Sequence, residues 1–283
     1  MTLAQISLRR YSNPAELLAD GNSFLTEAPY SNSYILGSLT GRQTELKYSA
    51  IIFDSNDAPI LMAANLEATI VSLSQSSRCT KEVLELLVAD MKEQKLEVTE
   101  VRGPVDITTS FSQTFSDKYG KEVSPKERFR IYKCTEVIPT DIPVNGVRRL
   151  AQADDLILVT QWLKEFFIDC ELGCGIQSDS LAKSYIDSKS FQLWVNLVGE
   201  VVSMAATNRA NEFSINVCFV YTPKEYRGNG YAYQLVKGMA QELLQTYPAV
   251  VLNAFTKNLT SQGVYKRIGF AMESEYTTYI FSR

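Results

Sequence analysis

Hydrophobic and polar positions along the 283-residue chain form two similar successions of helical and extended patterns. Apolar residues that recur every three to four positions favour a helix, whereas apolar residues at alternate positions favour a strand. The first half predicts helices at 13–19, 31–39, 81–91 and from Pro104 onward, and strands at 48–54, 59–65, 69–73, 98–102 and 127–134. The second half predicts helices at 153–167, 178–187, 231–246 and from Asn258 onward, and strands at 191–197, 201–207, 213–221, 250–255 and in two closing segments.

The order of elements is nearly the same in both halves. We infer a structural pseudo-repeat, left by an early duplication whose sequence identity is no longer visible. Pro139, Pro143 and Gly146 punctuate a polar stretch between the halves, which places the boundary at 135–146. The prediction is an α/β protein with an N-terminal domain at 1–138 and a C-terminal domain at 146–283.

The segment between the predicted strand 213–221 and the next helix is rich in glycine. Pro223 ends the strand, because proline cannot donate to a ladder. Gly228 and Gly230 permit positive φ and a close approach to a ligand. The first free N–H groups of the following helix, together with the loop amides, would form a phosphate cradle with Arg227 at its mouth.

A plain strand-to-helix turn is the structural alternative for this segment. Two other phosphate-binding signatures fit poorly, because the chain has neither Gly-x-Gly-x-x-Gly followed by an acidic residue nor the Gly-Lys-Ser/Thr of a P-loop.

A second signature follows about thirty residues later. Asn258, Ser261, Tyr265, Gly269 and Phe270 match the pattern Asn-x-x-Ser-x-x-x-Tyr-x-x-x-Gly-Phe. Together with the Arg/Gln-x-x-Gly-x-Gly/Ala pattern at Arg227, Gly230 and Ala232, this resembles the GNAT-type N-acetyltransferases over about 146–283.

The resemblance implies two GNAT-like domains, each with a mixed, mostly antiparallel sheet flanked by helices, of which the first is degenerate. It also implies acetyl-CoA as cosubstrate. The residues it assigns to acetyl-CoA binding are Phe219, Val220, Tyr221, Arg227, Gly228, Asn229, Gly230, Tyr231, Ala232, Asn258, Ser261 and Tyr265.

In the family the strands at 213–221 and 250–255 splay apart, and the thioester enters the gap. A backbone N–H near Val220 would then bind the acyl oxygen, and Tyr265 would be the general acid. Each residue also has a structural alternative: Asn258 as a helix N-cap with Ser261 in the first turn, and Tyr265 as an aromatic that packs on Ile268.

The corresponding N-terminal loop, 72–81, contains no glycine, and the second signature is missing around 104–119. We therefore expect that the N-terminal half has lost cofactor binding and serves as a packing partner or substrate wall. Arg78, at a predicted helix start, is a further candidate for holding an anion.

The chain contains no histidine, which excludes Ser-His-Asp and Cys-His catalysis and every histidine-ligated metal. Glu171, Asp169 and Glu212 are the candidate general bases, and a bound water is an alternative. For Glu171 and Asp169 we favour the structural alternative of solvated loop carboxylates, and for Glu212 the alternative is a side chain that points outward. The acidity of the 166–175 loop is weakly consistent with a cationic amine acceptor.

Net charge and cysteine content limit the partners. The formal net charge is −4 and the pI about 5.2, which argues against nucleic acid. No apolar run is long enough for a membrane span, and the N-terminus does not resemble a secretory signal. Five dispersed cysteines fit a reducing cytoplasm, and Cys170-x-x-x-Cys174 supplies too few ligands for a metal site.

The sequence thus predicts a metal-free acyltransferase, a monomer or homodimer, that moves an acetyl group from acetyl-CoA to a primary amine of a small molecule or peptide by direct attack. A non-catalytic acyl-CoA-binding sensor or interaction module remains an alternative from another class. An enzyme that uses a longer acyl-CoA also remains open, because the motifs contact CoA and not the acyl chain.

Overall fold

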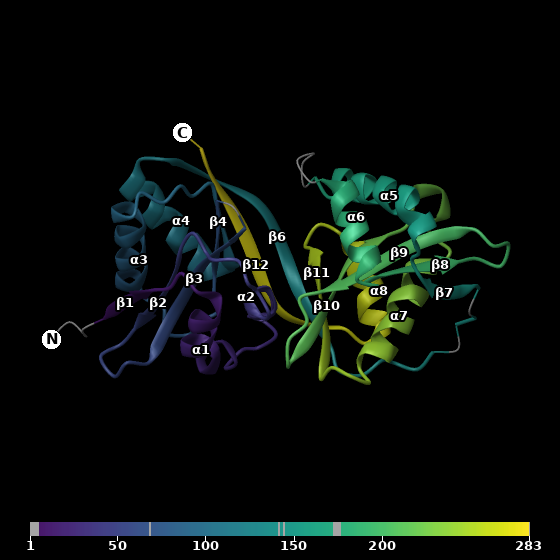
Figure 1. The fold of residues 1–283 in the computed structure, drawn as a ribbon, viewed down its shortest axis with the longest axis horizontal. Coiled ribbons are helices and arrows are strands. Elements are labelled where there is room, and N and C mark those ends of the chain that lie inside the picture. Colours follow the sequence, from purple (N-terminus) through teal and green to yellow (C-terminus); the bar gives the residue numbers. More distant parts are fainter. Residues whose placement is uncertain (1–5, 68, 141, 144, 172–176, 283) are drawn as a thin grey trace. The chain divides into compact units, whose positions relative to one another are not determined.

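A computed structural model describes residues 6–67, 69–140, 142–143, 145–171 and 177–282. The chain divides into two compact units (Figure 1). Unit 1 comprises Met1–Ile131, Ala254–Lys257 and Met272–Arg283, and unit 2 comprises Tyr132–Asn253 and Asn258–Ala271.

The first ten elements form most of unit 1. Its strands are β1 (Ser7–Arg10), β2 (Ser49–Phe53), β3 (Pro59–Glu67), β4 (Ile70–Leu73), β5 (Glu100–Pro104), β6 (Glu122–Cys134) and, from the end of the chain, β12 (Ala271–Ser282). Its helices are α1 (Pro14–Leu25), α2 (Ser33–Leu39), α3 (Lys81–Glu93) and α4 (Val105–Tyr119).

The strands of unit 1 are arranged in the order β1-β2-β3-β4-β5-β12-β6. Neighbours from β1 to β4 are antiparallel, β4 and β5 are parallel, and β12 is antiparallel to β5. Figure 1 shows β12 in yellow beside β6. The last strand of the chain therefore completes the sheet of the N-terminal unit.

Helices cover both faces of this sheet because its strands alternate apolar side chains between the faces. Ile52 and Leu61 join the core formed with α3 and α4, where Phe111 and Phe115 are fully buried. Their neighbours point the other way: Met62 and Ile51 approach Gly21 of α1, where an added Cβ would lie 2.1 and 3.2 Å from them.

Unit 2 repeats the same succession. Its strands are β7 (Val147–Leu150), β8 (Phe191–Val195), β9 (Val201–Asn208), β10 (Ser214–Tyr221) and β11 (Ala249–Phe255). Its helices are α5 (Leu156–Asp169), α6 (Ser178–Asp187), α7 (Tyr231–Leu243) and α8 (Leu259–Ile268), with short 3₁₀ turns η1 (Ala153–Asp155) and η2 (Lys224–Tyr226).

Its strands are arranged in the order β11-β10-β9-β8-β7, and only the β10–β11 pair is parallel. Helices α5 and α6 form a core with Phe191, Leu193 and Met204. Helix α7 contacts β8, β9 and β10 and buries Leu235, Val236 and Met239.

The expected repetition of element order is confirmed, since both units place two helices after the first strand and one helix between the two parallel strands. Three details were wrong. The short strands β1 and β7 were not expected, and the two closing strands are one twelve-residue strand, β12. The domain boundary at 135–146 stays a prediction. The contacts in the structure group 254–257 and 272–283 with the N-terminal unit.

The role of β12 in unit 1 can be tested at Phe281, which is 6% exposed and lies 4.4 Å from Phe115 between ring centroids. Replacing this buried ring with alanine should destabilise the protein by about 3–5 kcal/mol, because the cavity cannot fully close. Met272→Ala on the same strand, where the side chain is 56% exposed, is the control and should change stability by less than about 0.5 kcal/mol. Equal, small effects in denaturant unfolding would contradict this packing.

Candidate active site

Strand β10 contains a bulge. Strand β10 pairs with β11 from Ser214 to Val217, and the pairing ends there. Between Cys218 and Tyr221, β10 advances three residues while β9 advances two, from Ala206 to Met204. One extra residue is therefore inserted into β10 where the strand leaves β11, which bends the strand and exposes backbone groups beyond the last parallel pair.

The backbone of Phe219 adopts a left-handed conformation at this bulge, with φ of +51°. For a side chain other than glycine this costs on the order of 1–2 kcal/mol. Four aromatic rings surround Phe219 and compensate for the strain. The ring centroids of Phe166, Phe167, Tyr185 and Phe191 lie 5.7, 6.0, 5.4 and 6.1 Å from that of Phe219.

The thiol next to the bulge is not a nucleophile at neutral pH. Burial raises the pKa of Cys218 to about 12, so the side chain stays protonated.

The glycine-rich loop begins directly after β10 and leads to α7. Gly228 and Gly230 have φ of +85° and +79°, and a Cβ at either position would meet nothing within 4 Å. Gly230 is the N-cap of α7, and no side chain caps the helix there. The helix start expected near Asn229 or Gly230 is confirmed. The free N–H groups in the first turn of such a helix, with the positive end of the helix dipole, suit an anion.

Arg227 is held within unit 2. Its Nε donates to the carbonyl oxygen of Thr222 at 2.8 Å, and one terminal nitrogen donates to Asp169 Oδ2 at 2.6 Å. The guanidinium also lies 5.7 Å from the ring centre of Tyr221. About half of the side chain, 46%, remains exposed, so further N–H groups of Arg227 face solvent.

The remaining loop residues are arranged around this arginine. Asn229 donates from its side chain to the carbonyl oxygen of Tyr226 at 3.0 Å, which stabilises the turn. Tyr231 and Ala232 open α7 and are half-buried, as is Val220 in β10. The hydroxyl of the buried Tyr221 donates to Glu165 at 2.9 Å, and burial together with that carboxylate raises the pKa of Tyr221.

The second signature builds helix α8. Asn258 is its N-cap, and its side chain accepts from the backbone N–H of Ser261 at 3.0 Å, as the structural alternative predicted. Gly269 ends the helix with φ of +125°, where an added Cβ would lie 2.4 Å from the carbonyl oxygen of Glu136. Both the conformation and the close approach require glycine here.

Tyr265 lies on α8 and is 6% exposed. Its ring is 6.4 Å from Tyr132 and 6.0 Å from Phe270. Burial raises the pKa of Tyr265 well above its usual range, the nearby Cys170 raises it further, and a hydrogen bond with the Ser261 side chain lowers it. The hydroxyl is therefore protonated at neutral pH, as a general acid must be.

The candidate bases differ in their surroundings. Asp169, the last residue of α5, is paired with Arg227 and lies 3.9 Å from Lys224 Nζ. Glu171 is exposed, with φ of +56°, just beyond that helix. Glu212 precedes β10 at the end opposite the bulge, roughly 20 Å away along the strand. Of the expected loop at 166–175, residues 166–169 belong to α5, and 172–175, with Cys174, lie outside the described residues.

Unit 1 has a closed counterpart of this site. The added Cβ at Gly103 of β5 would lie 2.9 Å from the carbonyl oxygen of Leu73 at the end of β4, so the two parallel strands stay close together. Arg78 in the following loop is 3.6 Å from Asp54 and 3.8 Å from Glu27. Its positive charge is therefore already balanced by carboxylates.

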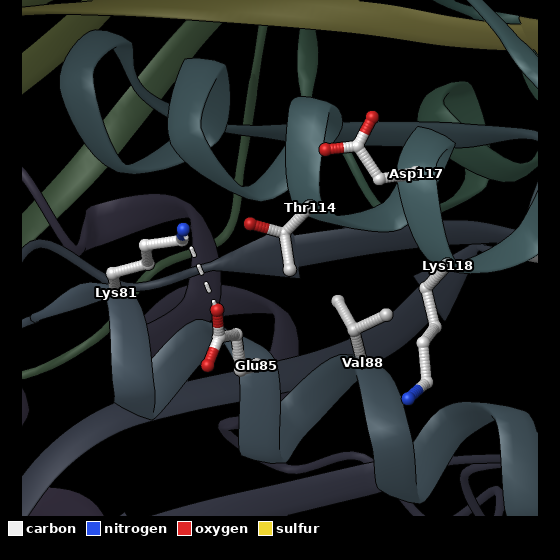
Figure 2. A pocket seen from close by; sticks show the side chains of 6 residues that line it. All are labelled: Lys81, Glu85, Val88, Thr114, Asp117 and Lys118. Carbon is white, nitrogen blue, oxygen red and sulfur yellow. Dashed lines mark ion pairs between the residues drawn. The ribbon is translucent and has the colours of Figure 1, made fainter.

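Unit 1 also has a surface hollow. It is lined by Lys81, Glu85, Val88, Thr114, Asp117 and Lys118 of α3 and α4 (Figure 2). Five of these six side chains are polar or charged, and Lys81 pairs with Glu85 at 3.6 Å, so the hollow is a solvated groove between two helices.

No group of three or more Cys, Asp or Glu side chains within the described ranges is arranged to hold a metal ion. In that same part of the chain, no helix is long and apolar enough to cross a membrane.

Sequence reasoning missed the contacts that support the site. The Arg227–Asp169 and Tyr221–Glu165 pairs join residues 58 and 56 positions apart. The aromatic cluster around Phe219 likewise combines β10 with α5, α6 and β8. In the sequence, the adjacent Phe166 and Phe167 were the one hint of this aromatic cluster.

Comparisons with known proteins agree with this architecture. Residues 197–280 match the family described as FR47-like protein. A GCN5-related N-acetyltransferase from Sphaerobacter thermophilus aligns with a TM-score of 0.64 at 13% identity, covering 96% of this chain and 94% of that chain. A Drosophila protein aligns with a TM-score of 0.67 at 11% identity, covering 97% and 98%.

A tandem GNAT protein from the clavulanic acid biosynthesis pathway aligns with a TM-score of 0.57 at 12% identity, covering 97% of this chain and 98% of that chain. No curated protein matches the chain. The matched family segment contains β10, the glycine-rich loop and α8, and the structural matches span both units. The chain therefore has the fold of tandem GNAT-type N-acetyltransferases, and its C-terminal part matches the FR47-like family.

Proposed function

We propose that unit 2 transfers an acetyl group from acetyl-CoA to a primary amine of a small molecule or peptide. The observation that carries this proposal is the uncapped, glycine-flanked start of α7 directly beyond the bulge in β10. A helix start with free first-turn N–H groups suits the phosphates of CoA, and a bend that frees backbone groups suits the thioester carbonyl.

Backbone groups at Gly228, Asn229, Gly230, Tyr231 and Ala232 are assigned to the pyrophosphate of CoA. The open space at both glycines supports this assignment, because an L side chain there would occupy the cradle. Phe219, Val220 and Tyr221 line the path of the pantetheine arm along the bulge. Asn258 and Ser261 flank it from α8, although the Asn258 side chain already caps that helix.

The reaction is a direct acyl transfer. The amine nitrogen attacks the thioester carbonyl carbon, a C–N bond forms, and the C–S bond breaks. A backbone N–H near Val220 stabilises the oxygen as it gains charge, and one such donor is worth about 3–4 kcal/mol. Much of the remaining gain comes from orientation of the two reactants.

Two protons move in this scheme. Tyr265 gives its proton to the departing CoA thiolate. Its raised pKa means that the phenol enters the reaction protonated. The attacking amine loses its proton to Glu171 or to a bound water. Asp169 is a weaker candidate for this base, because its charge is balanced by Arg227.

The cradle can be tested with a pair of substitutions at Gly230. Asparagine and aspartate both tolerate the left-handed conformation, so Gly230→Asn and Gly230→Asp should fold alike. Only aspartate adds negative charge next to the phosphates, and we expect it to weaken acetyl-CoA binding at least tenfold more than asparagine does.

Thermal unfolding measures this effect. For the unchanged protein, acetyl-CoA at a hundred times its Kd should add about 2.7 kcal/mol of stability, with each kcal/mol raising the midpoint by roughly 2–4 °C. Identical shifts in the Asn and Asp variants would show that phosphates do not bind at this helix start.

Tyr265→Phe tests the general acid. Turnover should fall about 10²–10⁴-fold with little change in acetyl-CoA affinity, because the phenol acts only on the departing thiolate. Because its pKa is raised, Tyr265 stays protonated as the pH rises, so it should produce no loss of kcat between about pH 7 and 10. Thiol release assayed with a panel of amines measures both. An unchanged rate would remove the acid role, and acetyl-CoA binding without transfer to any amine would favour an acyl-CoA sensor.

A further inference from the structure

Two basic side chains of the glycine-rich loop converge on one carboxylate of α5. Arg227 donates to Asp169 Oδ2 at 2.6 Å, and Lys224 Nζ lies 3.9 Å from Asp169 Oδ1. Asp169 is the last residue of α5, whereas both basic residues stand in the loop that precedes α7. The loop assigned to the phosphates thus has its positive charge directed at an internal anion.

This contact has the properties of an exchangeable pair. The Asp169 side chain is 29% exposed and the Arg227 side chain 46% exposed, and ion pairs at such positions contribute little net stability. A CoA molecule presents several phosphate charges, and a guanidinium binds phosphate and carboxylate oxygens in the same planar geometry. A phosphate can therefore take the place of Asp169 at Arg227.

The second hydrogen bond of Arg227 keeps the guanidinium at the loop during such an exchange. Its Nε donates to the carbonyl oxygen of Thr222 at 2.8 Å, which lies in the loop's own strand end and does not involve α5. Loss of Asp169 therefore leaves Arg227 anchored beside the cradle with its terminal nitrogens free.

We propose that Asp169 is an internal competitor for the phosphate groups of CoA, and that it holds Arg227 and Lys224 until a phosphate displaces it. This inference rests on the proposed function, because it concerns the same cradle. It identifies Asp169 as a residue that sets the affinity for the acyl donor and reassigns Arg227 from an open phosphate ligand to one that exchanges partners.

The same exchange changes the surroundings of the candidate base. Asp169 is followed by Cys170, which lies close to Tyr265, and by Glu171, the candidate base. When phosphate displaces Asp169, the end of α5 loses its tie to the loop and a carboxylate next to the candidate base becomes free.

Asp169→Asn tests the competition. The amide keeps the shape of the side chain and can still accept from Arg227, so the fold is preserved while the negative charge is removed. We expect CoA to bind about three- to tenfold more tightly at low salt, and the gain to shrink at high salt because exposed charges are screened.

Three controls separate the competition from other effects. Asp187→Asn removes the same charge from the same unit. Asp187 pairs with Lys183 four residues away on α6, so this substitution should leave CoA affinity unchanged. Pantetheine, which carries no phosphate, should bind both proteins equally. In an Arg227→Ala background the gain from Asp169→Asn should fall by more than half, because the released partner is missing.

Calorimetric titration distinguishes the outcomes. Tighter CoA binding confined to Asp169→Asn supports the competition. Unchanged or weaker CoA binding in Asp169→Asn, with normal binding by the unchanged protein, overturns it and makes Asp169 a structural support of the loop. If neither folded protein binds CoA, the proposed function fails, and the inference fails with it.

Discussion

Phe219 is held in a left-handed conformation inside β10, and the arrangement of the candidate site follows from it. The extra residue of the bulge ends the pairing with β11, so the carboxyl end of β10 diverges where a ligand is expected. It also directs the chain into Pro223, η2 and the glycine-rich loop, which starts α7 with uncapped amides. The strain at Phe219 is sustained by the surrounding aromatic rings, so the packing of α5 and α6 supports the geometry of the loop.

The two units show what this constraint contributes. They share the order of elements and the parallel pair after an antiparallel meander, yet β4 has no residue with positive φ and its end lies close to Gly103 of β5. The following loop of unit 1 carries no glycine, and its polar groups are bound by side chains from other segments of unit 1. The Gln75 N–H donates to Asn32, and Arg78 pairs with carboxylates. The same fold therefore has an open glycine-rich loop in unit 2, whereas the matching loop in unit 1 has its polar groups already paired within that unit.

Much of this was visible in the sequence because burial repeats with the period of each element. The helix at 178–187 was predicted at its observed bounds, and the glycines of the loop and the Asn258 cap were identified from residue type alone. The partner of β12 was not predictable, since an alternating pattern fixes which face of a strand is buried and not which neighbour it pairs with. The conformation of Phe219 and the Arg227–Asp169 pair depend on residues distant in the chain, and no local pattern encodes them.

The central claim is that an acyl-CoA binds at the bulge and loop of unit 2 and not at the matching segment of unit 1. Titration of isotope-labelled protein with acetyl-CoA, followed through backbone amide resonances, tests it most directly. The account predicts large, saturable changes in the amide resonances of 219–221 and 228–232, and no such changes at 72–81. Changes concentrated at 72–81, or no changes with millimolar ligand and folded protein, would contradict it.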